Sequence, residues 1–434
     1  EKEAYRVILD ESADIYTVLN HASWKLDGII ELPETGIFRC EDQNGNNLKI
    51  QCGTEGTFVQ TGDIPAMGFA QIKCVKEPGA SENAELENDS FNIEGKSIET
   101  KYYSIEFNDY GQMIRVYDKE AKREVLAEGS RGNVLQMFED KPLGNDAWDI
   151  DIFYQQKMKE ITDLQKFEIV NSGPLMTVVH LEWKYMNSML EQDIILYEDN
   201  RRIDFRTKVD YHENHQLLKA AFPVDIRTTY ATYDVQYGNV KRPNHWNTSW
   251  DQARFETVAH RFADLSEHDY GVALLNDCKY GYDVKDNLLR ITLLKAATHP
   301  DHIQDQGLHE FTYALLPHQG DCINGRVIQE AHRLNRPLEL RKGTVKLPYE
   351  SFLAFDCDHV EVDAIKKSED GNYLVVRFHE FAGSRCQAAI RPGFSFTAWA
   401  EGDLRERPIQ EFSGETEISM QLKPFEIKTI LFKC

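Results

Sequence analysis

The segment RRIDFRTKVDY, residues 201–211, alternates apolar and charged side chains and is typical of a β-strand. On one face of such a strand lie Ile203, Phe205, Thr207 and Val209, and on the other lie Asp204, Arg206, Lys208 and Asp210. A strand of this kind has one side in a hydrophobic core and the other side in water.

The same alternation recurs along most of the chain. Residues 102–126 and 166–185 each predict two strands joined by a polar turn, Asn-Asp-Tyr-Gly in the first and Asn-Ser-Gly-Pro in the second. Residues 372–381 and 425–433 predict further strands, and the best helical pattern is RVIQEAHRLN, residues 326–335, followed by Pro337. Many strands with long connections favour an all-β fold of several β-sandwich domains.

Two changes in composition suggest domain boundaries. Residues 76–90 are polar and contain few bulky apolar side chains, and residues 333–348 form a second such stretch. We therefore expect three domains: a small β-sandwich in residues 1–85, a large β domain in residues 86–340, and a C-terminal β-sandwich in residues 341–434.

Charge and hydropathy exclude several kinds of partner. The 434-residue chain has a net charge of −23, which argues against nucleic acid and against an anionic membrane surface. No apolar run approaches the roughly 20 residues of a membrane span, and no signal region opens the chain. Because the sequence begins without Met in a strand-like run, we expect a fragment or a processed form.

The cysteine and histidine patterns give weak evidence for metal. None of the eight cysteines forms a C-x-x-C pair, so we expect reduced thiols in a cytoplasmic protein. One loop-like segment groups possible ligands: His299, Asp301, His302, Asp305 and His309. Their irregular spacing is more typical of an ordinary loop than of a zinc site.

Three segments rich in polar and aromatic residues stand out from the strand pattern. They are residues 139–157 (EDKPLGNDAWDIDIFYQQK), residues 237–256 and residues 276–287. Loops on a rigid scaffold commonly carry function. Carboxylates around a Trp ring suit a sugar site, because the ring stacks on C–H bonds and the carboxylates accept hydrogen bonds from hydroxyls. A solvated acidic loop has the same composition.

These segments also carry a resemblance to a known family. LQMFEDKPLGNDAWDID (135–151), GNVKRPNHWNTSWDQARFE (238–256) and GLHEFTYALLPHQG (307–320) resemble the C-terminal half of glycoside hydrolase family 38, the α-mannosidases, in its cytosolic and bacterial branch. The resemblance covers essentially the whole chain. It implies that the large domain is a galactose-mutarotase-like supersandwich that follows a catalytic α/β barrel.

The resemblance also implies a retaining mechanism and a zinc ion held by His and Asp residues of the barrel. No nucleophile, acid/base residue or zinc ligand of that kind can be placed in this sequence. We therefore expect no catalytic residue and no metal in this chain, and zinc only in the full-length enzyme. The expected partners are an α-mannoside oligosaccharide and the N-terminal catalytic domain, with a homo-oligomer possible.

The resemblance assigns roles to nine residues. Asp146, Trp148 and Asp149 would form a loop facing the barrel, in contact with sugar or with the domain interface. Arg242 and His245 would anchor a loop or the interface. A loop after a strand would reach over the active site, with Lys279, Tyr280, Tyr282 and Asp283 on it or simply exposed to solvent. An apolar face around Trp148, Trp246 and Trp250 would mark where the barrel docks.

Two other functions remain open at this stage. An independent sugar epimerase would use a Glu and His pair for proton transfer, and no such pair stands out. A non-catalytic carbohydrate-binding module would need no such residues. The upstream sequence would separate these alternatives, because an α-mannosidase needs a barrel with a nucleophilic Asp before this region.

Overall fold

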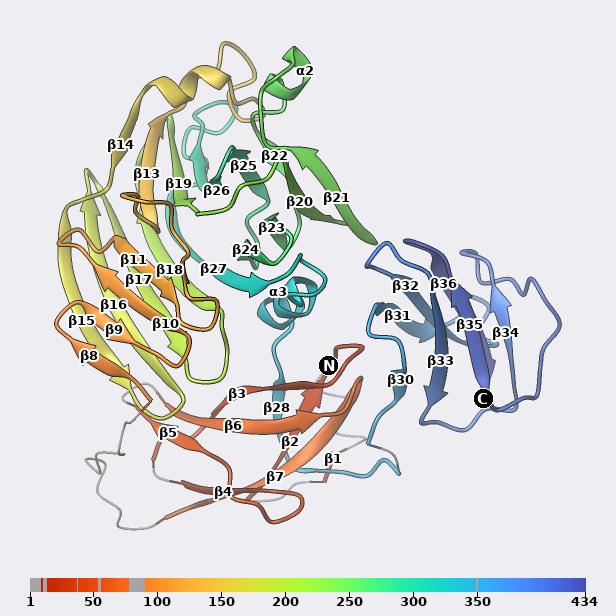
Figure 1. The fold of residues 1–434 in the computed structure, drawn as a ribbon. Coiled ribbons are helices and arrows are strands. Elements are labelled where there is room, and N and C mark those ends of the chain that lie inside the picture. The colour runs from red at the N-terminus through yellow and green to blue at the C-terminus, as the bar shows by residue number, and fades with distance from the viewer. Residues whose placement is uncertain (1–8, 11–13, 37, 54–55, 78–89, 349) are drawn as a thin grey trace. The chain divides into compact units, whose positions relative to one another are not determined.

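The computed structural model describes residues 9–10, 14–36, 38–53, 56–77, 90–348 and 350–434. It forms two compact units (Figure 1). Unit 1 comprises residues 1–84, 236–239 and 336–434, and unit 2 comprises residues 85–235 and 240–335.

Unit 2 is built mainly from three sheets. The nine-stranded sheet has the order β15 (Leu164–Ser172), β16 (Met176–Tyr185), β17 (Ser188–Tyr197), β18 (Ile203–Tyr211), β27 (Gly307–Gln319), β24 (Tyr270–Asn276), β23 (Phe262–Ser266), β20 (Tyr230–Val235) and β21 (Gly238–Pro243). The six-stranded sheet has the order β14 (Met158–Glu160), β13 (Val134–Glu139), β19 (Gln216–Pro223), β26 (Leu288–Ala296), β25 (Gly281–Lys285) and β22 (Thr257–Val258). The five-stranded sheet has the order β12 (Arg123–Glu124), β11 (Met113–Asp118), β10 (Tyr103–Phe107), β9 (Ser97–Glu99) and β8 (Asn92–Glu94).

Strand β18 shows why this sequence forms a sandwich. Ile203, Phe205 and Val209 are fully buried in a core to which all three sheets contribute. On the opposite face Arg206, Lys208 and Asp210 are exposed, as the alternation predicts. The exception is Asp204, which is buried because the Arg202 guanidinium binds it, with Nε to Oδ1 at 2.6 Å.

The predicted turns and the predicted helix are present. Strands β10 and β11 pair across residues 108–112, and β15 and β16 pair across residues 173–175, both antiparallel. The helix α3 (Val327–Asn335) ends two residues before Pro337. The all-β prediction of several β-sandwiches is therefore confirmed.

Unit 1 contains two smaller cores. The first lies between a four-stranded sheet, β28 (Glu339–Lys342), β2 (Ile15–Asn20), β7 (Gly68–Lys76) and β4 (Phe38–Asp42), and a three-stranded sheet, β3 (Leu26–Leu32), β6 (Thr57–Ile64) and β5 (Ile50–Cys52). A two-stranded sheet joins β1 (Leu9–Asp10) to β29 (Thr344–Val345). The second core lies between β30 (Leu353–Phe355), β33 (Cys386–Pro392) and β35 (Ile418–Leu422) and a sheet of β31 (Val360–Lys367), β32 (Leu374–Glu380), β36 (Ile427–Lys433) and β34 (Ala398–Gly402).

The expected boundaries relate to these elements as follows. The first, residues 76–90, lies mostly outside the described residues. The second, residues 333–348, contains the end of α3 and the short strands β28 and β29, which pair with β2 and β1. The cut expected between residues 340 and 341 falls inside β28, and the three-domain division stays a prediction. In the described part of the chain, helices are all too short or too polar to cross a membrane.

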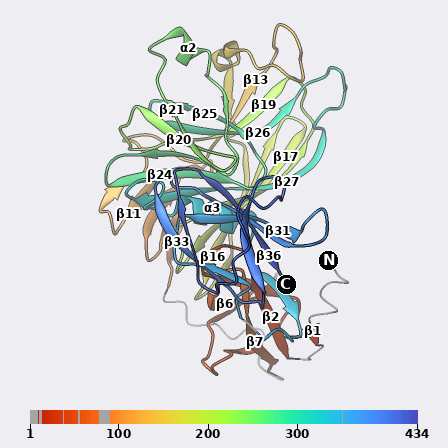
Figure 2. The same ribbon diagram turned by 90° about the vertical axis from the view of Figure 1, so that its right-hand side faces the viewer.

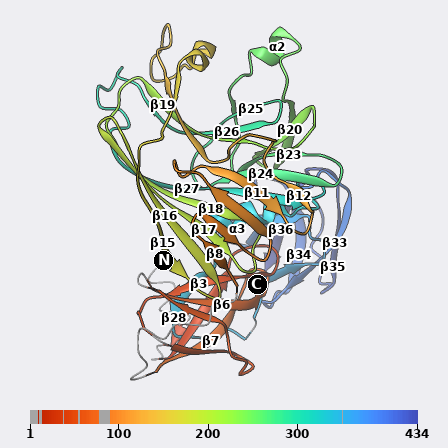
Figure 3. The same cartoon turned by 60° about the vertical axis from the view of Figure 1, so that its left-hand side comes forward.

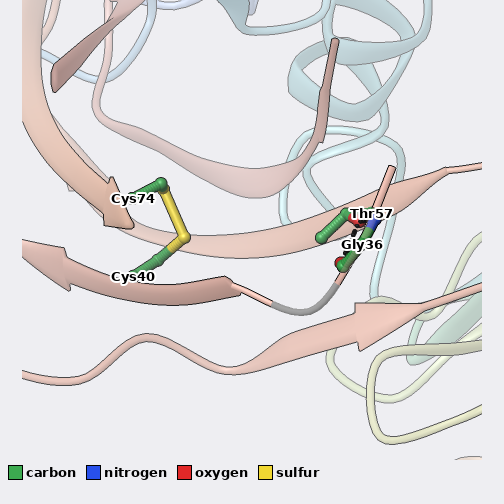
Figure 4. The surroundings of a disulfide bond; sticks show 4 residues. All are labelled: Gly36, Cys40, Thr57 and Cys74. Atoms are coloured by element: carbon green, nitrogen blue, oxygen red, sulfur yellow. Dashed lines mark hydrogen bonds between the residues drawn. A yellow bond between two sulfur atoms is a disulfide. The ribbon is translucent and has the colours of Figure 1, made fainter. Parts of the chain in front are cut away.

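The expectation of reduced thiols is wrong for one pair. Cys40 on β4 and Cys74 on β7 are direct partners across the two antiparallel strands, and they form a disulfide (Figure 4). Both side chains are buried in the first core of unit 1. The pairing was not visible in the sequence because it depends on the strand register, which brings residues 34 positions apart face to face. The other six cysteines are free.

Candidate functional site

Three connecting segments meet at one end of unit 2. They are residues 140–157 between β13 and β14, residues 244–256 between β21 and β22, and residues 297–306 between β26 and β27. The 140–157 segment contains the 3-10 helix η1 (Ile152–Gln156), and the 244–256 segment contains α2 (Ser249–Gln252). Figures 1, 2 and 3 show α2 and the 140–157 segment projecting from the same end of the unit.

The 140–157 segment exposes several large apolar side chains. Leu143 is 93% exposed, Trp148 70% and Phe153 60%. Asp140 and Tyr154 of the same segment are buried. Where exposed apolar side chains form a contiguous surface on a soluble domain, they commonly mark a binding site.

Asp146 anchors this segment instead of facing solvent. Its Oδ2 accepts hydrogen bonds from the backbone N–H groups of Thr298 (2.8 Å) and His299 (3.1 Å). Its Oδ1 lies 3.5 Å from Nδ1 of His215. Burial raises the pKa of Asp146, but these donors and the nearby His215 outweigh burial and hold the pKa below its usual value. The structure therefore places Asp146 in a structural latch.

Trp148 and Asp149 are free to reach a partner. The backbone N–H groups of both donate to the carbonyl of Asn145, at 2.7 and 2.9 Å. Asp149 Oδ2 accepts from the side-chain amide of Asn145 at 3.0 Å, and the carboxylate is otherwise exposed. A tight turn thus presents an indole ring beside a carboxylate.

The 244–256 segment presents a second aromatic ring. Thr248 caps α2 by accepting from the Asp251 N–H, and Asp251 in turn accepts from the Thr248 N–H and hydroxyl. This capping box holds the short helix and leaves Trp250 77% exposed. Of the three tryptophans expected on a docking face, Trp148 and Trp250 are exposed, whereas Trp246 is half-buried with the Lys285 ammonium 3.9 Å from its ring centre.

Arg242 and His245 support the same segment. Arg242 Nη1 donates to the carbonyl of Val258 at 2.8 Å. His245 Nδ1 accepts from the N–H of Asn247 at 3.4 Å and lies 3.9 Å from Asp251. These contacts place both side chains within the framework of the loop. The prediction that residues 237–256 contain no strand is wrong, since β21 covers residues 238–243.

The interpretation of residues 276–287 as one exposed loop is also wrong. Tyr282 and Asp283 lie in strand β25 and are 0% and 3% exposed. Tyr282 OH donates to the carbonyl of Leu274 at 3.1 Å. The two residues before the strand lie outside it: Tyr280 is exposed, and Lys279 is half-buried with its Nζ 4.5 Å from the Phe311 ring centre.

Asp283 belongs to a buried charge network that links the three predicted segments. Its Oδ1 accepts from Arg290 Nε at 2.7 Å, and its Oδ2 accepts from Lys219 Nζ at 2.6 Å. Lys219 also binds Glu256, and the Tyr154 hydroxyl donates to Glu256 at 2.6 Å. Tyr154, Glu256 and Asp283 come one from each predicted segment.

Burial and the neighbouring charges together set the pKa values of the groups in this network. Burial raises the pKa of Glu256, and the attraction of Lys219 opposes that rise without cancelling it. Burial lowers the pKa of Lys219, but Asp283 and Glu256 more than compensate, so the pKa is raised and the ammonium stays charged. With both carboxylates ionised, Lys219 and Arg290 balance them.

Sequence reasoning missed Lys219, Arg290, Tyr154 and Glu256. One signal was available for Lys219, which is a single charge inside the apolar run LLKAAF of β19. A lysine in such a run must find a carboxylate in the fold, because an unpaired buried ammonium costs several kcal/mol.

The described residues do not form a metal centre. Nowhere in the described ranges does a group of three His, Cys, Asp or Glu side chains come close enough to hold a metal ion. His309, one of the possible ligands grouped in residues 299–309, uses Nε2 to contact the Asp305 carbonyl at 3.0 Å. Among the described residues, the site therefore offers aromatic and carboxylate groups and no cluster of zinc ligands.

Two protein-family models match this chain. Residues 98–303 match the Glycosyl hydrolases family 38 C-terminal domain, and residues 359–430 match the Glycosyl hydrolases family 38 C-terminal beta sandwich domain. α-Mannosidase G of Dictyostelium discoideum is 33% identical over 97% of this chain and 40% of its own length. Human α-mannosidase 2C1 is 31% identical over 95% of this chain and 39% of its own length.

A solved structure has the same fold. The structure of an α-mannosidase from Enterococcus faecalis V583 superimposes with a TM-score of 0.77 at 14% identity, over 100% of this chain and 58% of that protein. The chain thus spans about two fifths of the length of the curated relatives named above.

Proposed function

The chain belongs to glycoside hydrolase family 38 through its C-terminal domains, and on that premise we propose that it is the C-terminal β-sandwich region of an α-mannosidase. The enzyme is proposed to hydrolyse terminal α-mannosides of oligosaccharides. Its mechanism is retaining: one carboxylate attacks the anomeric carbon, a second protonates the leaving oxygen, and water then cleaves the glycosyl-enzyme ester.

The exposed apolar side chains of residues 140–157 carry the proposal. Three apolar side chains in water, Leu143, Trp148 and Phe153, lie on a segment whose polar groups are tied down. Such a surface costs free energy unless a partner covers it. The proposed partner is the N-terminal catalytic domain, whose active site these loops complete.

Within this proposal the candidate residues divide into two groups. Trp148 and Asp149 face the catalytic cleft, where an indole stacks on sugar C–H bonds and a carboxylate accepts from a hydroxyl. Asp146, Arg242 and His245 hold the loops in place. Asp283 also holds the loops in place, through its bonds to Lys219 and Arg290.

The nucleophile, the acid/base residue and the zinc ion are proposed to belong to the catalytic domain. A zinc ion would bind sugar hydroxyls there and orient the nucleophile. The described residues of this chain do not fit such an ion, since no three potential ligands converge. What this chain supplies is loop positioning and substrate contact.

The location and assembly are also proposals. We place the enzyme in the cytoplasm, in keeping with six free cysteines. The Cys40–Cys74 disulfide is the observation that weighs against a reducing compartment. Self-association through Trp148 and Trp250 is proposed for the 434-residue chain when its apolar surface is uncovered.

One comparison tests the proposed function. The complete gene product should hydrolyse an aryl α-mannoside, lose activity on chelation and regain it with zinc. The 434-residue chain alone should show no activity above the uncatalysed rate, because removing a nucleophile costs many orders of magnitude in rate. Zinc-dependent turnover by the 434-residue chain alone would refute the division of roles.

A further inference from the structure

Two arginines line one small recess beside the 244–256 segment. Arg242 lies on β21, with its guanidinium carbon 4.6 Å from the centre of the Tyr233 ring and Nη1 bound to the Val258 carbonyl. Arg254 follows α2, and its side chain is exposed at the same recess. Neither guanidinium has a carboxylate partner among the residues that the structure describes.

Carboxylates that could pair with an arginine are abundant in this chain, since Asp and Glu number 72 against 49 Lys and Arg. Two well-buried arginines find one: Arg202 Nε binds Asp204 at 2.6 Å, and Arg290 Nε binds Asp283 at 2.7 Å. At the recess, neither Arg242 nor Arg254 forms such an ion pair with a described residue, although Arg242 is half-buried.

The one carboxylate that lines the recess is already engaged. Asp251 Oδ2 accepts from the Thr248 hydroxyl at 2.8 Å and from its N–H at 3.2 Å, and so caps α2. The Trp246 ring also lines the recess and carries the Lys285 ammonium on it at 3.9 Å. The local charge of the recess is therefore positive on a protein that is strongly negative overall.

The electrostatics of Arg242 reflect this imbalance. Burial lowers the pKa of Arg242, and repulsion from Arg254 lowers it further, against the opposing influence of Tyr233. Two like charges beside apolar rings destabilise each other. An anion placed between them would remove that cost.

We propose that this recess binds a small oxyanion, a carboxylate or phosphate group, between the guanidinium groups of Arg242 and Arg254. Guanidinium is the side chain best suited to such groups, because its planar donors match paired oxygens. The cavity volume is about 10 Å³, which admits one oxygen atom. The rest of the anion lies at the mouth, beside exposed Arg254.

The oxyanion has two possible sources with the same chemistry. It is a free anion from solution, or it is an acidic substituent on a sugar ligand. The proposal does not depend on α-mannosidase activity, because it concerns binding by this chain alone.

Calorimetric titration of the 434-residue chain with inorganic phosphate at low ionic strength tests the site. Arg242→Gln and Arg254→Gln should each weaken binding about tenfold, the effect of losing one charged hydrogen bond. Lys241→Gln is the matched control: it removes the same charge from the preceding residue of β21, whose exposed side chain does not line the recess, and should change binding less than twofold.

Three results would overturn the proposal: no binding of phosphate by the wild type, equal weakening by all three variants, or no weakening by Arg254→Gln. Arg254→Gln decides the matter if Arg242→Gln fails to fold, since the Arg254 side chain is exposed. Binding should also weaken as salt rises, because exposed charges are screened.

Titration with mannose 6-phosphate and with mannose separates the sources. Tighter binding of mannose 6-phosphate than of phosphate, lost in Arg254→Gln, assigns the anion to a sugar. Equal affinities assign the site to free anions. Mannose binding that matches mannose 6-phosphate and survives in Arg254→Gln would show a neutral sugar site, and the oxyanion proposal would be rejected.

Discussion

The phenol oxygen of Tyr154 lies 2.6 Å from Oε1 of Glu256, a residue 102 positions farther along the chain. This hydrogen bond joins the 140–157 segment to the end of the 244–256 segment. The Tyr154 ring packs edge-on against Phe138 at 5.0 Å between centroids. Two loops that carry exposed indoles thus share one buried attachment point.

Replacing Tyr154 by Phe should loosen this attachment. The change removes the hydroxyl and leaves the Glu256 carboxylate with one fewer donor, at a cost of about 1–2 kcal/mol in unfolding free energy. Urea denaturation of the 434-residue chain at pH 7 measures the loss. Tyr280→Phe is the control, because Tyr280 is exposed, and it should stay within about 0.5 kcal/mol.

Replacing Lys219 by Met should be far more damaging. Lys219 is fully buried, and its loss leaves Glu256 without a cation and Asp283 with Arg290 alone. Breaking a buried ion pair from one side costs about 3–5 kcal/mol. The Lys219→Met, Glu256→Gln double variant should lose less than the two single losses added together, since the second change removes the orphaned charge. Strict additivity would argue that the two side chains are not coupled.

Glu139 gives a prediction for acid. Hydrogen bonds from Lys141 and Lys157, each 2.7 Å, hold the pKa of Glu139 at about 2. The folded value lies below the unfolded value of about 4.3, so the stabilisation is present above that unfolded value and is lost as pH falls toward 2. The difference in Tm between wild type and Glu139→Gln should therefore be largest near pH 6, shrink as pH falls toward the folded pKa of about 2, and vanish only below it. A difference that is constant with pH would contradict the ion-pair explanation.

The sequence predicted the strands that have one face in a hydrophobic core and the other face in water. Phe205 is buried and Lys208 is exposed, in keeping with the alternation of apolar and polar residues along β18. Asp204 is polar as the alternation requires but is buried, because Arg202, just before β18, binds it. Period-two patterning therefore identifies strands but cannot identify a buried charge.

The candidate site was less predictable because its side chains find partners that lie far away in the sequence. Asp283 looked like a loop residue because a polar stretch precedes it, and its partner Lys219 lies 64 residues earlier. Asp146 and Asp149 have the same side chain on one turn, yet only the fold decides that Asp146 meets the N–H groups of Thr298 and His299. Contacts of this range are set by strand register and loop path, which local patterns do not encode.

That contrast makes Asp146 and Asp149 a matched pair for the last prediction. Asp146→Asn should destabilise the 434-residue chain by about 1–3 kcal/mol, because the amide replaces a charge-assisted acceptor of two N–H groups and loses the attraction of His215. Its pKa is lowered in the folded state, so this loss should appear above about pH 4 and fade as pH falls through the folded pKa.

Asp149→Asn is the same chemical change three residues later and should behave in the opposite way. Asp149 is exposed and bonds only within its own turn, through Asn145, so the unfolding free energy should stay within about 0.5 kcal/mol. In the complete gene product it should lower kcat/KM about tenfold or more, the value of one charged hydrogen bond made in the transition state. Turnover is therefore compared per folded molecule for both variants. If Asp149→Asn lowered stability and left turnover unchanged, Asp149 would be a structural residue like Asp146. If Asp146→Asn lowered turnover without affecting stability, the latch assignment would be reversed.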